Sequence, residues 1–400
     1  MTMKIMTRLA ITLIATLLYS NVHASWSPST INLFKSKSKQ YIHLQNAGFT
    51  SLWGGVKRRF SNSDQKGERL EVDLGEKFKT KKLEVYFFEG KKKGPLNVFF
   101  PGVFGSVDGA LAPAMINLLE KFPGHVLVIP NFLSVTYIKS DPIYTQSPEQ
   151  LDITVAQEII NSIILKIPDE KLQGINLFAE SLGSFVAAAV LSRISNNKKL
   201  IKHPMKITLM WPPSNLSLSL KNFDVGISKS LKKYESCGFV TNAVKVGYYF
   251  LYQDIPKDMS KEFIECMESY MYHFAFVESI ENSFEAYMDT KKIKDEKLPK
   301  DFKTFFSSYN KAFADLIKNN APELKIKYWL KRRNFENTEV RIITSQNDFI
   351  NTGVDWNKVI EESYLGKNNI IILPWGGHSG GLAMPIWEEV FGKEIFNVKI

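Results

Sequence analysis

The sequence predicts an α/β fold, in which a mostly parallel sheet is flanked by helices and interrupted by a helical insertion. Short apolar runs alternate with amphipathic helical patterns up to residue 212, which is typical of parallel strands joined by helices. Residues 213–337 contain no run that resembles a buried strand, and two such runs then return at residues 340–343 and 370–373. One sheet with an insertion explains this order better than two consecutive domains.

The predicted elements follow from local pattern and turn chemistry. Residues 82–88 alternate in polarity, residues 96–100 are more continuously apolar, and the Gly/Lys turn between them predicts a hairpin. Ser147 as N-cap and Pro148 at the first position predict the start of a long helix. The remaining expected elements are strands at 125–129, 175–178, 207–211, 340–343 and 370–373 and helices at 111–122 and 384–390.

The N-terminal 24 residues are predicted to be a secretory signal peptide. Lys4 and Arg8 lead into an apolar run at residues 9–18, and Val22 and Ala24 supply the small residues of a cleavage site. The run is too short to span a membrane as a helix, and a buried core helix is the alternative. Cleavage after Ala24 would give an exported protein, periplasmic or secreted.

Composition indicates a folded chain with a basic surface. Hydrophobic residues make up 44% of the chain, enough for a substantial core. The formal net charge is +10, and the loss of Lys4 and Arg8 would leave +8 on the mature chain. Such a charge is compatible with an anionic membrane surface, but the lysines are dispersed, and the cluster at residues 91–93 is flanked by glycines as in a solvated turn. We expect no nucleic-acid partner and no integral membrane segment.

No zinc spacing, P-loop or dinucleotide fingerprint occurs in the sequence, so neither a metal nor a cofactor is expected. The two cysteines, Cys237 and Cys266, both lie in the mature chain. An even count in an exported chain suggests one disulfide, and two buried reduced thiols are the alternative.

A serine lies at the turn between the predicted strand 175–178 and an alanine-rich helix. Ala179 and Gly183 are small residues two positions on either side of Ser181, as a tight strand-turn-helix connection requires. This geometry would lift the Ser181 hydroxyl above the sheet and aim the N–H of Leu182 at a developing oxyanion. The five-residue pattern also recurs by chance, so the rest of the chain must decide.

Each late strand is followed by a residue that a nucleophilic serine needs. Asp348 follows the strand at 340–343, and His378 follows the strand at 370–373. An imidazole can take the proton of a serine hydroxyl, and a carboxylate can orient that imidazole. Each residue also has a structural explanation, Asp348 as a turn cap and His378 as a loop residue. The order Ser, Asp, His after successive strands favours catalysis.

In these motifs the sequence resembles the α/β-hydrolase superfamily. The similarity rests on residues 179–183, the loop 101–103, Asp348 and the glycines before His378, and it covers roughly residues 82–212 and 338–391. The resemblance implies that Ser181 is the nucleophile, that His378 is the base and then the acid, and that Asp348 is the orienting carboxylate.

The resemblance also implies an oxyanion hole formed by the backbone N–H groups of Leu182 and Val103. The sequence departs from the family pattern at two positions. Ala179 replaces the first glycine of the serine motif, and Pro101 stands where many members have histidine before the glycine.

The predicted domain organisation is a signal peptide (1–24), a first core segment (25–212), a helical cap (213–337) and a second core segment (338–400). Members of the superfamily often carry a cap at this point of the chain. Its apolar side chains are suited to an acyl chain, although most are expected to form the cap's own core. They are Phe263, Met267, Met271, Phe274, Phe276, Phe284, Tyr287 and Met288.

The leading hypothesis is an exported serine hydrolase that cleaves a carboxylic ester or thioester of a small or lipid-like molecule. Acyl transfer or peptide cleavage by the same residues is a close alternative, because the motifs identify the nucleophile and not the acceptor. A non-catalytic binding protein on the same fold is the alternative from another class, and the presence of Ser181, Asp348 and His378 argues against it.

Overall fold

The computed structural model describes residues 26–39, 66–74, 82–109, 112–140, 148–194, 203–238, 260–294, 296–330, 338–363, 365, 369–374, 377–379 and 386–397. The predicted signal peptide lies outside these residues. None of the described helices combines the length and apolarity that a membrane span requires.

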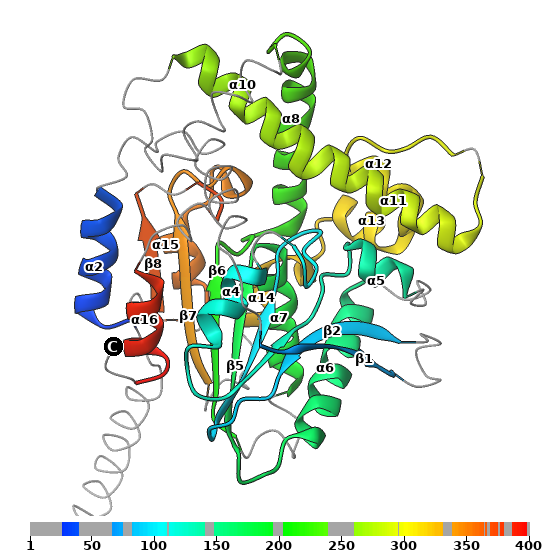
Figure 1. Cartoon of the computed structure of the whole chain (residues 1–400). Helices are drawn as coiled ribbons and strands as arrows, with labels where there is room; N and C mark the ends of the chain where they lie inside the picture. The colour runs from blue at the N-terminus through cyan, green and yellow to red at the C-terminus, as the bar shows by residue number, and fades with distance from the viewer. Residues whose placement is uncertain are drawn as a thin grey trace, which may run out of the picture.

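A single sheet of eight strands lies at the centre of the described part of the chain (Figure 1). Its spatial order is β1-β2-β4-β3-β5-β6-β7-β8. β2 pairs antiparallel with both β1 and β4, and every pair from β4 to β8 is parallel. The strands are β1 Glu68–Val72, β2 Leu83–Phe88, β3 Gly94–Phe100, β4 His125–Val128, β5 Leu172–Glu180, β6 Met205–Met210, β7 Thr338–Ser345 and β8 Ile370–Leu373. The mostly parallel sheet flanked by helices that the sequence predicts is confirmed.

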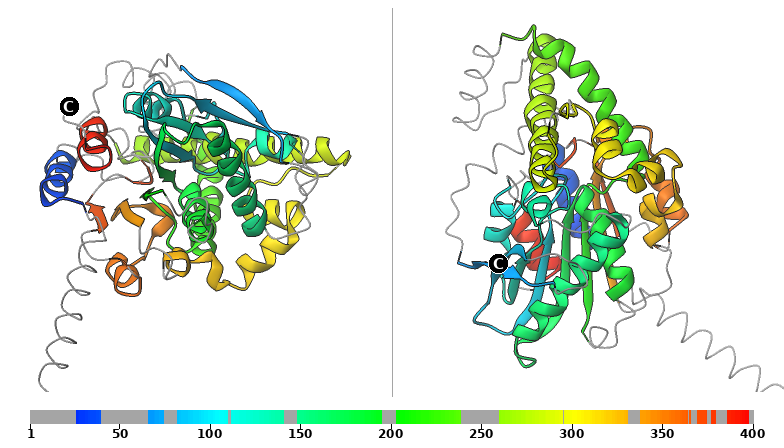
Figure 2. Two further views of the ribbon diagram at one scale, coloured as in Figure 1. Left: turned by 90° about the horizontal axis from the view of Figure 1, so that it is seen from below. Right: turned by 90° about the vertical axis from the view of Figure 1, so that its right-hand side faces the viewer.

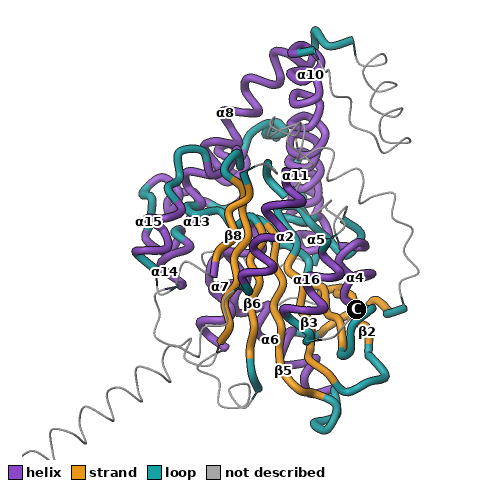
Figure 3. The backbone as a smooth tube through the Cα atoms, turned by 90° about the vertical axis from the view of Figure 1, so that its left-hand side faces the viewer, coloured by secondary structure: helices purple, strands orange, loops and turns teal. Residues whose placement is uncertain are grey.

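Helices cover both faces of this sheet (Figure 2). One face carries α6 (Pro148–Lys166), α7 (Leu182–Ile194) and α14 (Ile326–Leu330), and the other carries α2 (Pro28–Lys39), α4 (Ala112–Leu119) and α16 (Trp387–Glu394), seen together in Figure 3. The shorter helices α5 (Val135–Lys139), η4 (Phe349–Asn351) and α15 (Trp356–Glu361) lie in connections. Neighbouring residues of a strand therefore enter opposite cores, as Val98 and Phe99 do.

The double cover explains the apolar composition of the strands. β5 is buried at every position except Gln173, because a parallel strand with helices on both faces has no solvent side. Phe178 is fully buried and stacks on Phe391 of α16 with ring centroids 5.0 Å apart. The strand that carries the serine motif is thus held rigidly from both sides.

The predicted hairpin between residues 82–88 and 96–100 is wrong. β2 and β3 do not pair, because β4 lies between them and bonds to both. The connection crosses the start of β4 at backbone contact: a Cβ at Gly90 would lie 1.8 Å from the carbonyl oxygen of Gly124, and one at Gly94 would lie 2.6 Å from the Gly124 nitrogen. The glycines that suggested a tight turn instead allow this crossing.

The described residues between β6 and β7 are helical apart from loops and one isolated bridge. Their elements are α8 (Leu216–Tyr234), α10 (Lys261–Tyr272), the π-helix η2 (His273–Val277), α11 (Glu278–Lys291), α12 (Phe302–Tyr309), α13 (Lys311–Lys318), η3 (Pro322–Leu324) and α14. α8 and α10 extend away from the sheet (Figure 1) and pack closely at Gly226, where a Cβ would lie 2.4 Å from a ring carbon of Tyr272. We call α8–α13 the inserted helices.

The apolar residues of the inserted helices that the sequence singles out divide as follows. Phe284 is fully buried, whereas Phe276, Tyr287 and Met288 are partly buried against the core. Phe263 is half-buried. The side chains of Met267, Met271 and Phe274 lie outside the described set.

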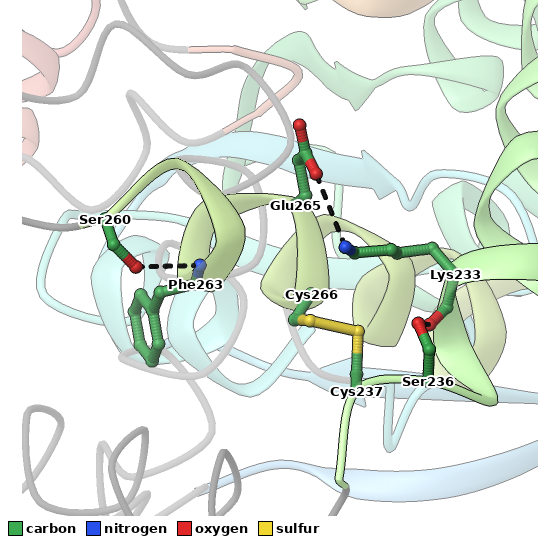
Figure 4. Close-up of a disulfide and its surroundings, with 7 residues drawn as sticks. All are labelled: Lys233, Ser236, Cys237, Ser260, Phe263, Glu265 and Cys266. Atoms are coloured by element: carbon green, nitrogen blue, oxygen red, sulfur yellow. Dashed lines mark hydrogen bonds and ion pairs between the residues drawn. A yellow bond between two sulfur atoms is a disulfide. The ribbon is translucent and has the colours of Figure 1, made fainter.

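A disulfide between Cys237 and Cys266 joins the end of α8 to α10 (Figure 4). The ion pair of Lys233 and Glu265, 3.6 Å apart, lies beside it, and the Ser260 hydroxyl accepts the N–H of Phe263 at the start of α10. The two cysteines are 29 positions apart, so the bond closes a long loop across the two helices.

Replacing both Cys237 and Cys266 by serine should lower the free energy of unfolding by about 3 kcal/mol, because the unfolded chain regains the entropy of that loop. Urea titration of the wild type and the double variant, with and without reductant, measures the difference. Ser236→Ala, which alters the exposed neighbour of Cys237, serves as the control. A double variant as stable as the oxidised wild type would contradict the expectation.

Candidate active site

Ser181 stands at the turn between β5 and α7 in the left-handed backbone region, with φ of 50°. Its N–H donates to the carbonyl of Met210 at the end of β6 (2.9 Å), and its carbonyl accepts the N–H of Ser184 in the first turn of α7 (2.9 Å). A non-glycine residue with positive φ is uncommon and strained. Here the sheet and the helix together impose it, and the strain falls on the residue that the sequence predicts as nucleophile.

Two close approaches explain the small residues around Ser181. A Cβ at Gly183 would lie 2.3 Å from the carbonyl oxygen of Phe100 and 2.5 Å from that of Pro101, so only glycine lets α7 begin this close to β3. A Cβ at Gly102 would lie 3.2 Å from the Cβ of Ser181. The loop 101–103 therefore lies directly beside the serine, as an oxyanion loop must.

His378 bridges Ser181 and Asp348. Its Nε2 lies 2.7 Å from the Ser181 Oγ, and its Nδ1 lies 3.1 and 3.2 Å from the two carboxylate oxygens of Asp348. With Nδ1 protonated and donating to the carboxylate, Nε2 is free to accept the serine proton. The three side chains are 5%, 8% and 2% exposed for Ser181, His378 and Asp348, respectively. Residues 197 positions apart in sequence are thus brought into hydrogen-bond contact.

Asp348 has further donors on the turn that it begins. Its Oδ1 accepts the N–H of Ile350 (3.1 Å), and its Oδ2 accepts the side-chain amide of Asn351 (2.9 Å). A buried carboxylate requires such partners, because an unpaired charge is costly in a dry environment. Asn351 was not predicted from the sequence, and no motif marks it.

The loop that carries His378 is held by side chains at the end of β7. The hydroxyl of Ser345 donates to the carbonyl of Gly377 and accepts the indole N–H of Trp211 at 2.8 Å. The N–H of Gly377 donates to the side-chain oxygen of Asn347 at 2.9 Å. The residue before His378 is therefore fixed at both its N–H and its carbonyl.

Aromatic rings cover the imidazole of His378. Phe349 meets it edge-on with centroids 5.6 Å apart, and Phe223 of α8 does so at 6.4 Å. Phe276 of the π-helix packs against Phe223 with centroids 4.5 Å apart. The inserted helices thus contribute directly to the low exposure of the site, and removal of water strengthens the electrostatic interactions inside it.

The loop 101–103, which is predicted to supply an oxyanion N–H, leads directly to a contact with the inserted helices. Phe104, with φ of 60°, follows Val103 and stacks on Phe302 of α12 with centroids 5.7 Å apart. A bulky residue in the left-handed region is a true outlier, so packing must hold it there. Val103 and Phe104 are only partly buried, which leaves this loop accessible beside Ser181.

A small, mainly apolar cavity lies next to this loop, between the ends of β3 and β4 and helices α5, α6 and α7. It is lined by Phe100, Pro101, Ile129, Pro130, Asn131, Phe132, Tyr137, Val155, Ala156, Gly183 and Val186. Pro101 and Gly183 place it directly adjacent to the serine turn.

Comparison with known proteins shows distant structural similarity. No protein-family model matches the chain, and no curated protein matches its sequence. Solved structures similar to it include an esterase of Pyrococcus furiosus (13% identity, TM-score 0.44, covering 83% of this chain and 90% of that one). Another is the carboxylesterase CesB of Bacillus subtilis (12% identity, TM-score 0.46, 91% and 98% covered). A third is proline iminopeptidase of Mycobacterium smegmatis (10% identity, TM-score 0.44, 82% and 97% covered). At such low identity, the activity of this chain has to be inferred from its own residues.

An acidic side chain of α8 lies one position after Phe223. The carboxylate of Asp224 accepts the N–H groups of Phe302 (2.8 Å) and Lys303 (3.2 Å) and so caps α12 from a neighbouring helix. Burial raises the pKa of Asp224 to about 6, and the charge of Asp301 adds to the rise. α12, which holds Phe302 against Phe104, thus depends on a carboxylate whose pKa is about 6.

The raised pKa of Asp224 predicts a pH dependence of stability. The folded protein binds the proton of Asp224 more tightly than the unfolded chain does. The protonated carboxyl therefore makes its full contribution to the free energy of unfolding below about pH 4, and this contribution is lost as the pH rises to about 6. Asp224→Asn removes the titration, so the variant should gain stability relative to the wild type across this window. Urea unfolding of both proteins from pH 4 to 7 measures the difference, and a difference that stays constant with pH would refute it.

Proposed function

We propose that this chain is an exported serine hydrolase that cleaves a carboxylic ester or thioester through an acyl-enzyme. The observation that carries the proposal is the contact of the Ser181 Oγ with the His378 Nε2 at 2.7 Å, with the Nδ1 of the same imidazole facing both oxygens of a buried carboxylate. This arrangement is what activation of a serine requires.

In the proposed reaction, the Ser181 Oγ attacks the carbonyl carbon of the ester while its proton passes to the His378 Nε2. Asp348 stabilises the imidazolium, and the N–H groups of Leu182 and Val103 receive the negative charge of the carbonyl oxygen. The tetrahedral intermediate then expels the alcohol or thiol, which takes the proton from His378. Water then attacks the acyl-enzyme while its proton passes to the His378 Nε2. The second intermediate expels the Ser181 oxygen, which takes the proton back, and the acid is released.

The surroundings of the serine favour an apolar substrate. Phe223 and Phe349 pack against the imidazole, Phe276 packs on Phe223, and the small cavity beside Gly183 is mainly apolar. An acyl or alcohol group without charge would gain from burial against these surfaces. We therefore propose an uncharged small or lipid-like ester as the substrate class.

Acyl transfer and peptide cleavage remain the alternative within the same chemistry, because the serine and histidine do not determine which acceptor attacks the acyl-enzyme. Product analysis with water, alcohols and amines as acceptors separates them. A non-catalytic role is disfavoured by the hydrogen bond between Ser181 and His378, which a binding protein has no need to keep.

Two observations support export. The predicted signal peptide precedes the described residues, and the bond between Cys237 and Cys266 is of a kind that persists in oxidising compartments. Both are compatible with a periplasmic or a secreted protein.

Ser181→Ala should abolish covalent labelling by a fluorophosphonate probe and lower ester hydrolysis by at least about a thousandfold, because the nucleophile is removed. His378→Ala should have a similar effect through loss of the base. Labelling rates and hydrolysis of p-nitrophenyl acetate measure both.

Ser192→Ala is the matched control for these variants. Ser192 is a buried serine of the same helix, α7, with its hydroxyl on the carbonyl of Ala189. The Ser192→Ala protein should react with the fluorophosphonate probe as fast as the wild type. Full labelling of the Ser181→Ala protein, or none of the folded wild type, would overturn the proposed function.

A further inference from the structure

The side chain of Asn351 uses every hydrogen-bonding group that it has. Its Oδ1 accepts the N–H of Ser214 (2.9 Å), and its Nδ2 donates to the Pro212 carbonyl (3.0 Å) and to the Oδ2 of Asp348 (2.9 Å). The residue is 5% exposed. The Pro212 carbonyl and the Asp348 carboxylate only accept, and the Ser214 N–H only donates, so the orientation of the amide is fixed. A flipped amide would place its oxygen against two acceptors and its NH₂ group against a donor.

The partners of Asn351 join two parts of the site that lie far apart in sequence. Pro212 and Ser214 belong to the segment between β6 and α8, where the inserted helices leave the sheet. α8 is also tied to the turn of Asp348, because the Nδ2 of Asn222 donates to the carbonyl of Ile350 at 3.1 Å. Phe223, the next residue of α8, packs on His378.

The orientation of the Asp348 carboxylate matters for the imidazole. Each oxygen lies within 3.2 Å of the His378 Nδ1, and each has one further donor, Ile350 N–H on Oδ1 and Asn351 on Oδ2. The torsion that rotates a carboxylate has a broad, weak preference of its own. The two additional donors, one from the backbone and one from Asn351, therefore set its plane.

We propose that Asn351 is a positioning residue, which holds Asp348 in the orientation that His378 requires and couples that orientation to the segment 212–214 from which the inserted helices start. This inference rests on the proposed function. The side chain of Asn351 bonds to Ser214, Pro212 and Asp348, so in this proposal it acts on the reaction through the carboxylate.

Asn351→Asp tests the proposal with a side chain of the same shape. When protonated, the new carboxyl can donate its one proton to Asp348 in place of the amide N–H, and the Pro212 carbonyl loses its donor. When ionised, it places a second negative charge against the first, and two carboxylates at this separation resist joint ionisation. The variant should therefore work best at low pH and lose activity as the pair ionises.

The readout is the pH profile of kcat and KM for p-nitrophenyl acetate. For the wild type, we expect kcat/KM to rise with pH and then to level off, as it does when one general base is required. For Asn351→Asp, we expect kcat/KM to fall again at higher pH, with kcat reduced about tenfold or more at neutral pH. KM should change by less than about twofold, because the residue does not contact the substrate.

Asn222→Asp is the matched control. The substitution makes the same chemical change in α8 and removes an amide donor to the turn of Asp348, but the acceptor that it affects is the carbonyl of Ile350 and not Asp348. It should keep a profile of the wild-type shape. Thermal unfolding of both variants verifies that they fold. If Asn351→Asp does not fold, Asn351→Ala replaces it, with the same expected loss in kcat at unchanged KM.

A folded Asn351→Asp protein with the profile and kcat of the wild type would overturn the proposal, and so would equal effects in Asn351→Asp and Asn222→Asp. The proposed hydrolase activity and the role of Asn351 can be disproved independently. If the wild type neither hydrolyses the ester nor reacts with a fluorophosphonate, the proposed function fails. The NMR chemical shift of the His378 Nδ1 proton, which reports its hydrogen bond to Asp348, then tests Asn351 on its own: a change in Asn351→Asp and not in Asn222→Asp supports the positioning role, and an unchanged shift overturns it.

Discussion

The buried carboxylate of Asp348 is the constraint on which the site depends. At 2% exposure it cannot be solvated by bulk water, so protein donors have to stabilise its charge. The N–H of Ile350, the amide of Asn351 and the imidazole of His378 do so. Because the imidazole is one of these donors, its ring plane follows from the carboxylate, and its Nε2 is thereby aimed at Ser181. The geometry of the serine contact is a consequence of satisfying one buried charge.

On the side of Ser181 away from His378, close backbone packing fixes the position of the turn. Gly183 lets the start of α7 approach the backbone at the end of β3, and Gly102 lets the loop 101–103 approach Ser181. The positive φ of Ser181 is tolerated because its N–H and carbonyl are both bonded, to Met210 and Ser184. Hydrogen bonds on one side and glycine contacts on the other leave the hydroxyl with little freedom, and such preorganisation lowers the cost of reaching a transition state.

Local sequence pattern predicted most of the sheet, because buried parallel strands have an apolar composition that needs no partner to be recognised. The strand at 370–373 matches β8 residue for residue, and Ser181, Asp348 and His378 follow strands that the structure contains. The pairing of β2 was mispredicted because β4 enters between it and β3 from later in the chain. Asn351 could not be found, since its amide bonds to Pro212, which is 139 positions away. Its role becomes visible only when the polar partners are placed in space.

The inserted helices impose a second requirement on the chemistry. They place Phe223 against the imidazole, with Phe276 packed on Phe223, and Phe302 against Phe104. The bond between Cys237 and Cys266 holds α8 and α10 together. In the proposed reaction, a dry cover would strengthen the interaction of Asp348 with the imidazolium, but hydrolysis would need a water molecule at the acyl-enzyme. The residues that would assist attack by the serine would therefore also limit the access of water in the second step. Under this proposal, the packing of the inserted helices, rather than the serine, histidine and aspartate, would decide whether an acyl group is passed to water or to a bulkier acceptor.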